Sequence, residues 1–468
     1  MSGSEVLPLI VLAGSIAILL FLILGLKIQA FLSLLIVAIG FGITAGMDPL
    51  AAIDSVRNGI GGTLGYVATV VGLGAMFGAL LEVSGGVQSL AGAMVSRSSS
   101  RGTQWALAIV GFLVSIPVFF DVALIILAPL LYGLAHRTGK KVLFFGLPLM
   151  AGMMVSHAFI PPTPGPIAVA ELMGADLAWV IVLGAAAGIP AMILAGPLWT
   201  PVALRLIGDH GAANVAASRK GAEDDQSGAA EMYMEPAAGI LQAGAMAAVS
   251  AILLPLVLIL LGATAKYWAA EGGVRTTLEF MGHPFVALIM AALTAYYFFG
   301  IRKQIDRAKL ARIMTSSLEP AGVVVLVTGA GGAFKQILVD SGMGASLASA
   351  FGGDGVPIIV FAFIVTAIVR VAQGSATVAM ITGAGLTAPV VQATVAAGLD
   401  YSQPQLALVV IAIASGASVA SHVNDSGFWL VSRYMGMSEA QTLKSFTSMT
   451  TIVGLVGFAM VSVMWLLV

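Results

Sequence analysis

Four short polar or proline-rich stretches interrupt the long apolar runs of this 468-residue chain: Ser115–Asp121, Ser156–Pro166, Gln373–Thr377 and Ser421–Gly427. Backbone N–H and C=O groups within lipid must be satisfied internally, so a broken helix survives at membrane depth only where it lines a cavity in the protein. The broken helix ends would present free N–H groups and the positive ends of helix dipoles, which attract anions. We therefore expect the four stretches to meet at a binding site for a small anion.

The polar side chains in these interruptions are the candidate site residues, because an ionisable group at membrane depth has a functional role by default. We expect substrate contacts from Ser115, Pro117, His157, Thr163, Gly374, Ser375, Thr377, His422 and Asn424. Asp121, Asp425 and His422 are the titratable groups among them that could carry a proton. Desolvation favours the neutral form of a carboxyl group, so a buried aspartate can keep a proton until the site opens.

Several ionisable residues at or near the interruptions, two of them outside the candidate set, have a structural interpretation as well. Asp121 could cap the second limb of a helical hairpin, and His157 could cap a broken helix. Arg370 could pair with a substrate anion, pair with an aspartate or snorkel towards water. Lys335 could neutralise Asp340, about one helical turn further on.

The composition is that of a membrane protein. Hydrophobic residues make up 59% of the chain, charged residues only 9%, and the mean hydropathy is +1.03. A soluble domain carries about a quarter charged residues. The apolar runs are continuous rather than alternating, which favours a helical bundle over a β-barrel. Because Met1–Pro8 lacks the basic n-region of a signal peptide, we expect the first apolar run to be retained.

Other classes of protein are excluded or disfavoured. The chain has no cysteine, which excludes disulfides, thiolate catalysis and cysteine-ligated metals. The net charge of -1 gives no reason to expect nucleic-acid binding. No P-loop, His-Glu-x-x-His or Gly-x-Ser-x-Gly motif occurs, which disfavours an ATP-driven pump and an intramembrane hydrolase. We therefore expect neither enzymatic activity nor a cofactor or metal site.

Two apolar stretches, at about 103–136 and 357–392, are too long for one span and are interrupted in the middle. The flanks of the first carry basic residues, which the positive-inside rule places in the cytoplasm: Arg97, Arg101, Arg137, Lys140 and Lys141. The flanks of the second carry Asp354 and Asp400 instead. We expect two re-entrant hairpins that enter from opposite sides, although ordinary pairs of spans would give the same loop charges.

The chain also contains an internal repeat, whose copies lie 257 positions apart. The first copy has Gly72, Gly74, Phe77, Leu81 and Ser84, and the second has Gly329, Gly331, Phe334, Leu338 and Ser341. Repeats that enter a membrane from opposite sides are typical of secondary transporters. The predicted fold is an all-α polytopic membrane protein with two inverted-topology repeats of five spans plus one re-entrant hairpin each. The expected boundaries are 1–207 and 237–468 for the repeats and 208–236 for a cytoplasmic linker.

The interrupted stretches resemble the gluconate permease family, the GntP-type gluconate:proton symporters of the ion transporter superfamily. The resemblance covers nearly the whole chain and is strongest in Ile116–Asp121, Ser156–Pro166, Gly374–Ala379 and Ser421–Trp429. It implies proton-coupled import of gluconate or a related sugar acid across the inner membrane of a bacterium, by a homodimer whose hairpins move with the substrate. Thr163 departs from the pattern, since many relatives have His there. This loss of a titratable group leaves the substrate and the coupling ion open.

Alternatives to a proton-coupled sugar-acid importer are a sodium-coupled carboxylate transporter, a carrier of D-serine or short hydroxy acids, and a passive anion channel. Unwound carbonyls and hydroxyls can coordinate Na⁺ as readily as they bind an anion. A membrane enzyme is disfavoured by the missing catalytic motifs.

Overall fold

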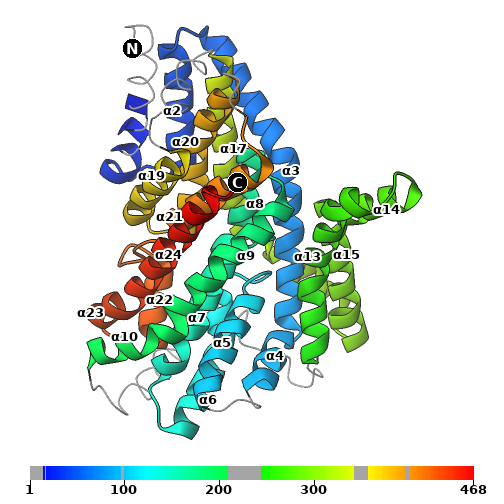
Figure 1. Ribbon diagram of the computed structural model, residues 1–468, viewed down its shortest axis with the longest axis vertical. Coiled ribbons are helices and arrows are strands. Elements are labelled where there is room, and N and C mark those ends of the chain that lie inside the picture. The colour runs from blue at the N-terminus through cyan, green and yellow to red at the C-terminus, as the bar shows by residue number, and fades with distance from the viewer. Residues whose placement is uncertain are drawn as a thin grey trace.

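The computed structural model describes residues 14–95 except 16 and 20, and then 100–208, 244–341, 357–396 and 400–468. All regular structure in these ranges is helical, as the composition predicts, and the helices form an elongated bundle (Figure 1). All of the predicted linker 208–236 except residue 208, and the beginning of the first apolar run up to residue 13, lie outside the described residues.

The helices of the first half are α2 (Ala30–Thr44), α3 (Pro49–Val83), α4 (Gly86–Val95), α5 (Ser100–Val114), α6 (Phe120–Thr138), α7 (Val142–Phe159), α8 (Pro164–Met173), α9 (Leu177–Ile193) and α10 (Thr200–Ile207). Those of the second half are α13 (Ala245–Trp268), α14 (Gly273–Gly282), α15 (Pro284–Ala295), α16 (Arg307–Ser316), α17 (Leu318–Asp340), α19 (Ile358–Gln373), α20 (Ala376–Ala396), α21 (Gln403–Ser418), α22 (Ser426–Tyr434), α23 (Glu439–Thr442) and α24 (Ser448–Trp465).

Within the described ranges, nine helical stretches are long and apolar enough to cross a membrane. Large apolar side chains are also exposed on the outside of the bundle, for example Leu253, Val257 and Leu261 on α13. Such a surface is unfavourable in water and suits contact with lipid. The protein is therefore a multi-pass membrane protein.

The interruptions expected from the sequence all break helices. Residues 115–119 separate α5 from α6, and residues 374–375 separate α19 from α20, so each pair forms a hairpin. The two hairpins lie towards opposite ends of the long axis (Figure 1). Prolines end α7 before α8, because a proline inside a helix removes a hydrogen bond, whereas Pro164 is accommodated at the first position of α8. Residues 419–425 separate α21 from α22.

The repeated helices α3 and α17 pack against each other in antiparallel directions. Gly59 lies on the backbone of Gly332, and Gly72, further along α3, lies near Leu318 at the start of α17. The two helices end at equivalent positions, Val83 and Asp340. Glycine allows such close contact because it has no Cβ atom.

Small residues also dock each hairpin onto the broken helix that follows it. Gly152 of α7 lies against the Ala108 carbonyl of α5, and Gly416 of α21 lies against the Phe363 carbonyl of α19. The same contact thus occurs in both halves of the chain, and it holds each hairpin tip next to a helix break.

The Gly78→Ala substitution should loosen the first hairpin from α3. A Cβ atom on Gly78 would collide with the Pro117 carbonyl, and both groups are backbone, so neither can move without a shift of a helix. We expect overpacking of about 1–3 kcal/mol, measured as a lower thermal midpoint in detergent. Gly65→Ala in the same helix is the matched control, because no atom lies within 4 Å of its added Cβ. Equal thermal midpoints for the two variants would contradict this close packing.

Candidate functional site

A cavity of about 140 Å³ lies where the helix breaks meet. It is lined by Phe119, Phe120, Asp121, Met154, His157, Arg370, Ser375, Ala376, Thr377, Asp425, Ser426, Gly427 and Phe446. Three helices begin at its wall, namely α6, α20 and α22. Their first N–H groups and the positive ends of their dipoles favour a negatively charged ligand.

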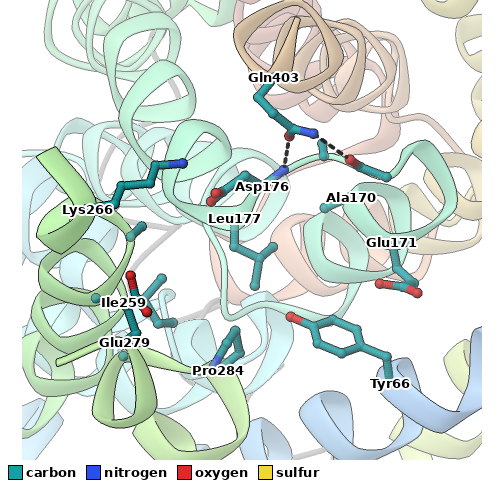
Figure 2. A pocket seen from close by; sticks show the side chains of 15 residues that line it. Tyr66, Ala170, Glu171, Asp176, Leu177, Ile259, Lys266, Glu279, Pro284 and Gln403 are labelled. Atoms are coloured by element: carbon teal, nitrogen blue, oxygen red, sulfur yellow. Dashed lines mark hydrogen bonds between the residues drawn. The ribbon is translucent and has the colours of Figure 1, made fainter. Parts of the chain in front are cut away.

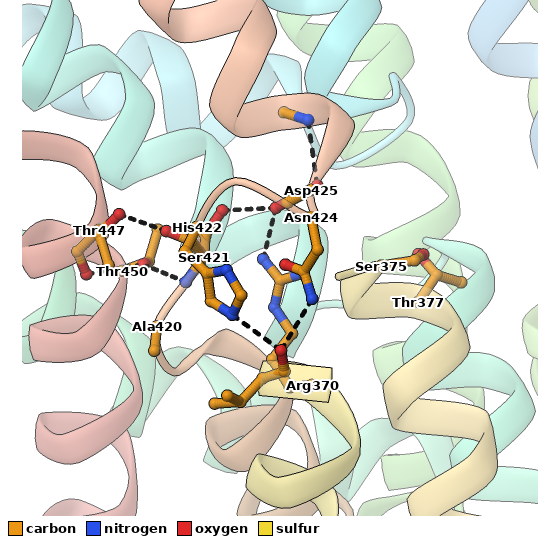
Figure 3. Close-up of polar contacts among 12 residues, drawn as sticks. Arg370, Ser375, Thr377, Ala420, Ser421, His422, Asn424, Asp425, Thr447 and Thr450 are labelled. Atoms are coloured by element: carbon orange, nitrogen blue, oxygen red, sulfur yellow. Dashed lines mark hydrogen bonds and ion pairs between the residues drawn. The ribbon is translucent and has the colours of Figure 1, made fainter. Parts of the chain in front are cut away.

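A buried ion pair between α19 and the α21–α22 break forms one wall of the cavity. Arg370 Nη2 lies 2.5 Å from Asp425 Oδ2, and the two side chains are 1% and 13% exposed. Ser421 donates to the same carboxylate at 2.5 Å, and the N–H of Gly427 donates to Asp425 Oδ1 at 3.0 Å (Figure 3). Asp425 therefore caps α22 and holds Arg370 at the same time.

Arg370 keeps donors that this pairing does not use. Its Nε and Nη1 atoms are buried and have no hydrogen-bond partner within the described part of the chain. His157 Nδ1 and Ser115 Oγ are likewise buried and have no hydrogen-bond partner there. Buried polar atoms are normally paired, so unpaired donors beside a cavity indicate where a ligand binds.

His157 and Thr377 face each other from α7 and α20. His157 Nε2 and Thr377 Oγ1 lie 3.4 Å apart. The centroids of the Phe119 ring and the His157 imidazole are 6.2 Å apart. The N–H of Val378 donates to Ser375 Oγ at 3.4 Å, so Ser375 caps the start of α20. The cavity thus has hydroxyl and imidazole groups opposite an arginine.

Asp121 lies at the start of α6 and exposes its carboxylate to the cavity. Its Oδ1 atom faces Gly427 at the start of α22. Among the described residues no hydrogen bond or ion pair satisfies this side chain. Asp121 and Asp425 therefore both line the cavity, but the Asp121 carboxylate is free and the Asp425 carboxylate is paired with Arg370.

His422 and Asn424 have a different place from the one expected. His422 Nε2 and Asn424 Nδ2 both donate to the carbonyl of Val371 at 2.8 Å (Figure 3). They satisfy the C-terminal end of α19 and do not line the cavity. The neighbouring Gly374 has φ of +88° and packs on the backbone of Asn424, which leaves no space for a side chain.

The α21–α22 break is anchored to the last helices of the chain. The N–H groups of Ala420 and Ser421 donate to Thr451 Oγ1 and Thr450 Oγ1, each at 3.2 Å. Thr447 Oγ1 donates to the carbonyl of Ser421 (Figure 3). This network satisfies the unwound backbone and fixes the position of Asp425.

The structure brings part of the expected set together. The cavity is lined by Asp121, His157, Ser375, Thr377 and Asp425. The expected residues that do not line it are Ser115, Pro117, Thr163, Gly374, His422 and Asn424. Thr163 is buried and donates to the carbonyl of Ile160 at 2.7 Å. Arg370 was recognised from the sequence only as an ambiguous charge, although an arginine inside an apolar stretch just before a hairpin tip is a usable signal.

A larger cavity, of about 640 Å³, lies between α3, the α8–α9 turn and the α13–α14 region (Figure 2). Gln403 there accepts from the N–H of Asp176 at 2.7 Å and donates to the carbonyl of Gly174 at 3.2 Å. Its wall carries three carboxylates, those of Glu171, Asp176 and Glu279, against the ammonium of Lys266. Glu279 is paired with Arg275 at 2.8 Å, and Glu171 interacts with Lys335. The smaller cavity is the candidate site, because three helices begin there beside the buried Arg370, which has free donors.

The sequence matches the model of the GntP family permeases over residues 7–468. The low-affinity gluconate transporter of Escherichia coli K12 is 40% identical over 95% of both chains. The gluconate permease of Bacillus subtilis is 35% identical over 99% of this chain and 100% of its own, and the Gnt-II system L-idonate transporter of E. coli is 34% identical over 96% and 97%.

Two solved transporters share the fold at low sequence identity. Neisseria gonorrhoeae MtrF superposes with a TM-score of 0.62 at 13% identity and covers 87% of this chain and 82% of its own. Alcanivorax borkumensis YdaH gives 0.55 at 16% identity, with 87% coverage of both chains. The match of the family model and of these relatives along nearly the whole sequence shows that this chain belongs to the GntP family of permeases.

Proposed function

We propose that this permease imports gluconate or a closely related sugar acid across a bacterial inner membrane, with one proton for each anion. Relatives that cover nearly the whole chain are named for gluconate and L-idonate, both sugar acids. The cavity offers what such a molecule needs, namely cationic and N–H donors for a carboxylate and hydroxyl or imidazole groups for the sugar hydroxyls.

The charge of the cavity is the observation that carries the proton coupling. Asp121 and Asp425 are opposed by the single guanidinium of Arg370, so the empty site has one excess negative charge when both carboxyl groups are ionised. A substrate carboxylate about 4 Å from this unpaired charge would be repelled by about 4 kcal/mol at an effective dielectric constant of about 20. Uptake of a proton removes this repulsion and allows the anion to bind.

Asp121 is the better candidate for the carrier of this proton. Asp425 already accepts hydrogen bonds from Arg370, Ser421 and the backbone of Gly427, all of which stabilise its ionised form. Asp121 has no comparable partner among the described residues and faces the same space. His422, the third expected carrier, is bonded to a backbone carbonyl outside the cavity.

The substrate carboxylate is placed at the free Nε and Nη1 donors of Arg370, beside the first N–H groups of α20 and α22. The two free donors lie on different edges of the guanidinium, because Nη2 between them is bonded to Asp425, so the carboxylate would accept from one of them and from the N–H groups at the helix starts. The hydroxyl groups of the sugar acid then face Ser375, Thr377 and His157.

The transport cycle is proposed to use two inverted-topology repeats with re-entrant hairpins. The antiparallel packing of α3 on α17 and the placement of the hairpins towards opposite ends of the molecule support this arrangement (Figure 1). Alternating access then moves one group of helices past the other around the bound substrate. Assembly as a homodimer follows only from the family resemblance and stays a prediction.

Isothermal titration of the purified protein with gluconate tests the proton coupling without a membrane. In buffers of different ionisation enthalpy at the same pH, the apparent binding enthalpy should change with a slope that corresponds to about one proton taken up per gluconate bound. A slope of zero, with gluconate bound, would contradict proton-linked binding. No heat with gluconate, but binding of L-idonate or a shorter hydroxy acid, would correct the substrate.

A further inference from the structure

The two hairpin tips differ in how they meet the repeated helices α3 and α17. At the first tip, the carbonyl of Pro117 packs directly on Gly78 of α3. The residues 257 positions further on are Gly374, at the second tip, and Lys335, in α17. These two are engaged elsewhere, since Gly374 packs on Asn424 and Lys335 Nζ donates to the carbonyl of Leu172 at 3.0 Å.

Lys335 is occupied by the broken helix α8 in this state. Leu172 lies in the last turn of α8, where free carbonyls and the negative end of the helix dipole attract a cation. Glu171, the residue before it, adds an opposite charge that interacts with Lys335. The side chain of Leu172 also packs on Gly331, one turn before Lys335 on α17.

We propose that Lys335 is a positioning residue of the transport cycle, which releases α8 and receives the tip of the second hairpin in the opposite state. Alternating access moves one repeat against the other, and for two repeats related by inverted symmetry we expect the opposite state to form in the second half the contacts that the first half makes here. The contact of Gly78 with Pro117 therefore has a counterpart, in which Lys335 meets residues 373–375. This inference rests on the proposed transport function and on the equivalence of the two repeats.

The second contact should differ chemically from the first, because α17 has Lys335 at the position where α3 has Gly78. The backbone of α17 cannot approach the tip as closely as α3 does at Gly78, so the Lys335 side chain fills the interval. Its ammonium then faces the start of α20, where Ser375 and Thr377 line the cavity. A cation beside the positive end of a helix is unfavourable, whereas a bound carboxylate between the two attracts both. Substrate should therefore favour the docked state.

Cysteine cross-linking tests the proposal directly, because the chain has no cysteine of its own. The full-length pairs are Lys335→Cys with Leu172→Cys for the state described here, and Lys335→Cys with Ser375→Cys for the opposite state. Both are treated in membrane vesicles with a short bifunctional thiol reagent. We expect both variants to cross-link. Gluconate should increase the yield of the cross-link to residue 375 and decrease the yield of the cross-link to residue 172. Lys335→Cys with Gln373→Cys provides a second pair at the same tip.

The outcomes separate this proposal from the substrate assignment. Cross-links at both positions that do not respond to gluconate but respond to another sugar acid would support the role of Lys335 and correct the substrate. Cross-linking of the Leu172 pair alone, under all conditions and with both tip residues, would overturn the proposal. Uptake by Lys335→Cys should also be restored by a thiol reagent that adds an aminoethyl group and not by a neutral reagent of similar size. Equal restoration by both would indicate a packing role and overturn it as well.

Discussion

Replacement of Arg370 by glutamine should lower the rate of gluconate uptake by at least ~30-fold, because it removes the arginine from the candidate substrate cavity. The loss of one partner from a buried, hydrogen-bonded charge pair typically costs about 2–5 kcal/mol, and about 1.4 kcal/mol corresponds to tenfold. Asp425 would also stay buried without its counter-ion. The measurement is initial uptake of labelled gluconate, normalised to the folded transporter in the membrane.

A double variant separates binding from stability. If Arg370 only neutralises Asp425, the variant with both Arg370→Gln and Asp425→Asn should regain uptake, since removal of both charges of a buried pair is often close to neutral for stability. We expect it to regain thermal stability but not uptake. Arg57→Gln is the matched control, because Arg57 forms an exposed ion pair with Asp54 at 3.1 Å and exposed pairs contribute about 0–1 kcal/mol. Uptake close to that of the unmodified protein in the double variant would show that Arg370 does not bind the substrate.

The second large effect is expected at Asp121. Asp121→Asn makes this side chain permanently neutral, as if protonated, so gluconate should still bind and exchange across the membrane. Accumulation driven by a proton gradient should be lost, because no proton needs to move with the anion. For one proton per anion, a gradient of about one pH unit supports about tenfold accumulation, and the variant should reach only equal concentrations on both sides.

The control for Asp121 is Asp176→Asn in the larger cavity. Asp176 caps α9 by accepting from the N–H of Ala178 at 2.8 Å, so its substitution should affect stability and leave proton-driven accumulation intact. The opposite pattern, with accumulation kept in Asp121→Asn and lost in Asp176→Asn, would move the coupling site to the larger cavity. Loss of accumulation in Asp425→Asn alone would assign the proton to the paired carboxylate.

The helical fold and the general position of the candidate site could be predicted from the sequence, because both follow from local patterns. Continuous apolar runs give membrane helices, and prolines or polar clusters within them break those helices wherever the chain folds. All four interruptions proved to be breaks between helices. Asp121, His157, Ser375, Thr377 and Asp425 therefore come together because each lies at or beside such a break.

The contacts of individual side chains could not be predicted in the same way, since they depend on the orientation of one helix against another. His422 and Asn424 lie in the right loop, yet both turn to a carbonyl of α19 and away from the cavity. Phe446 and Met154 contribute to the cavity wall, and nothing in the sequence distinguishes them from lipid-facing or core residues. The sequence did not predict the short helices α14 and α16, because neither contains a continuous apolar run.

Uptake of labelled gluconate into proteoliposomes, with an inward proton gradient imposed in the absence of sodium and the membrane potential clamped at zero, tests the central claim most directly. One proton per monoanion carries no net charge, so the proton gradient alone should drive accumulation and the clamp should not reduce it. Failure to accumulate under a proton gradient, combined with accumulation under a sodium gradient at equal pH, would contradict proton coupling. Flux that is linear in gluconate and never exceeds equilibrium under either gradient would contradict active transport.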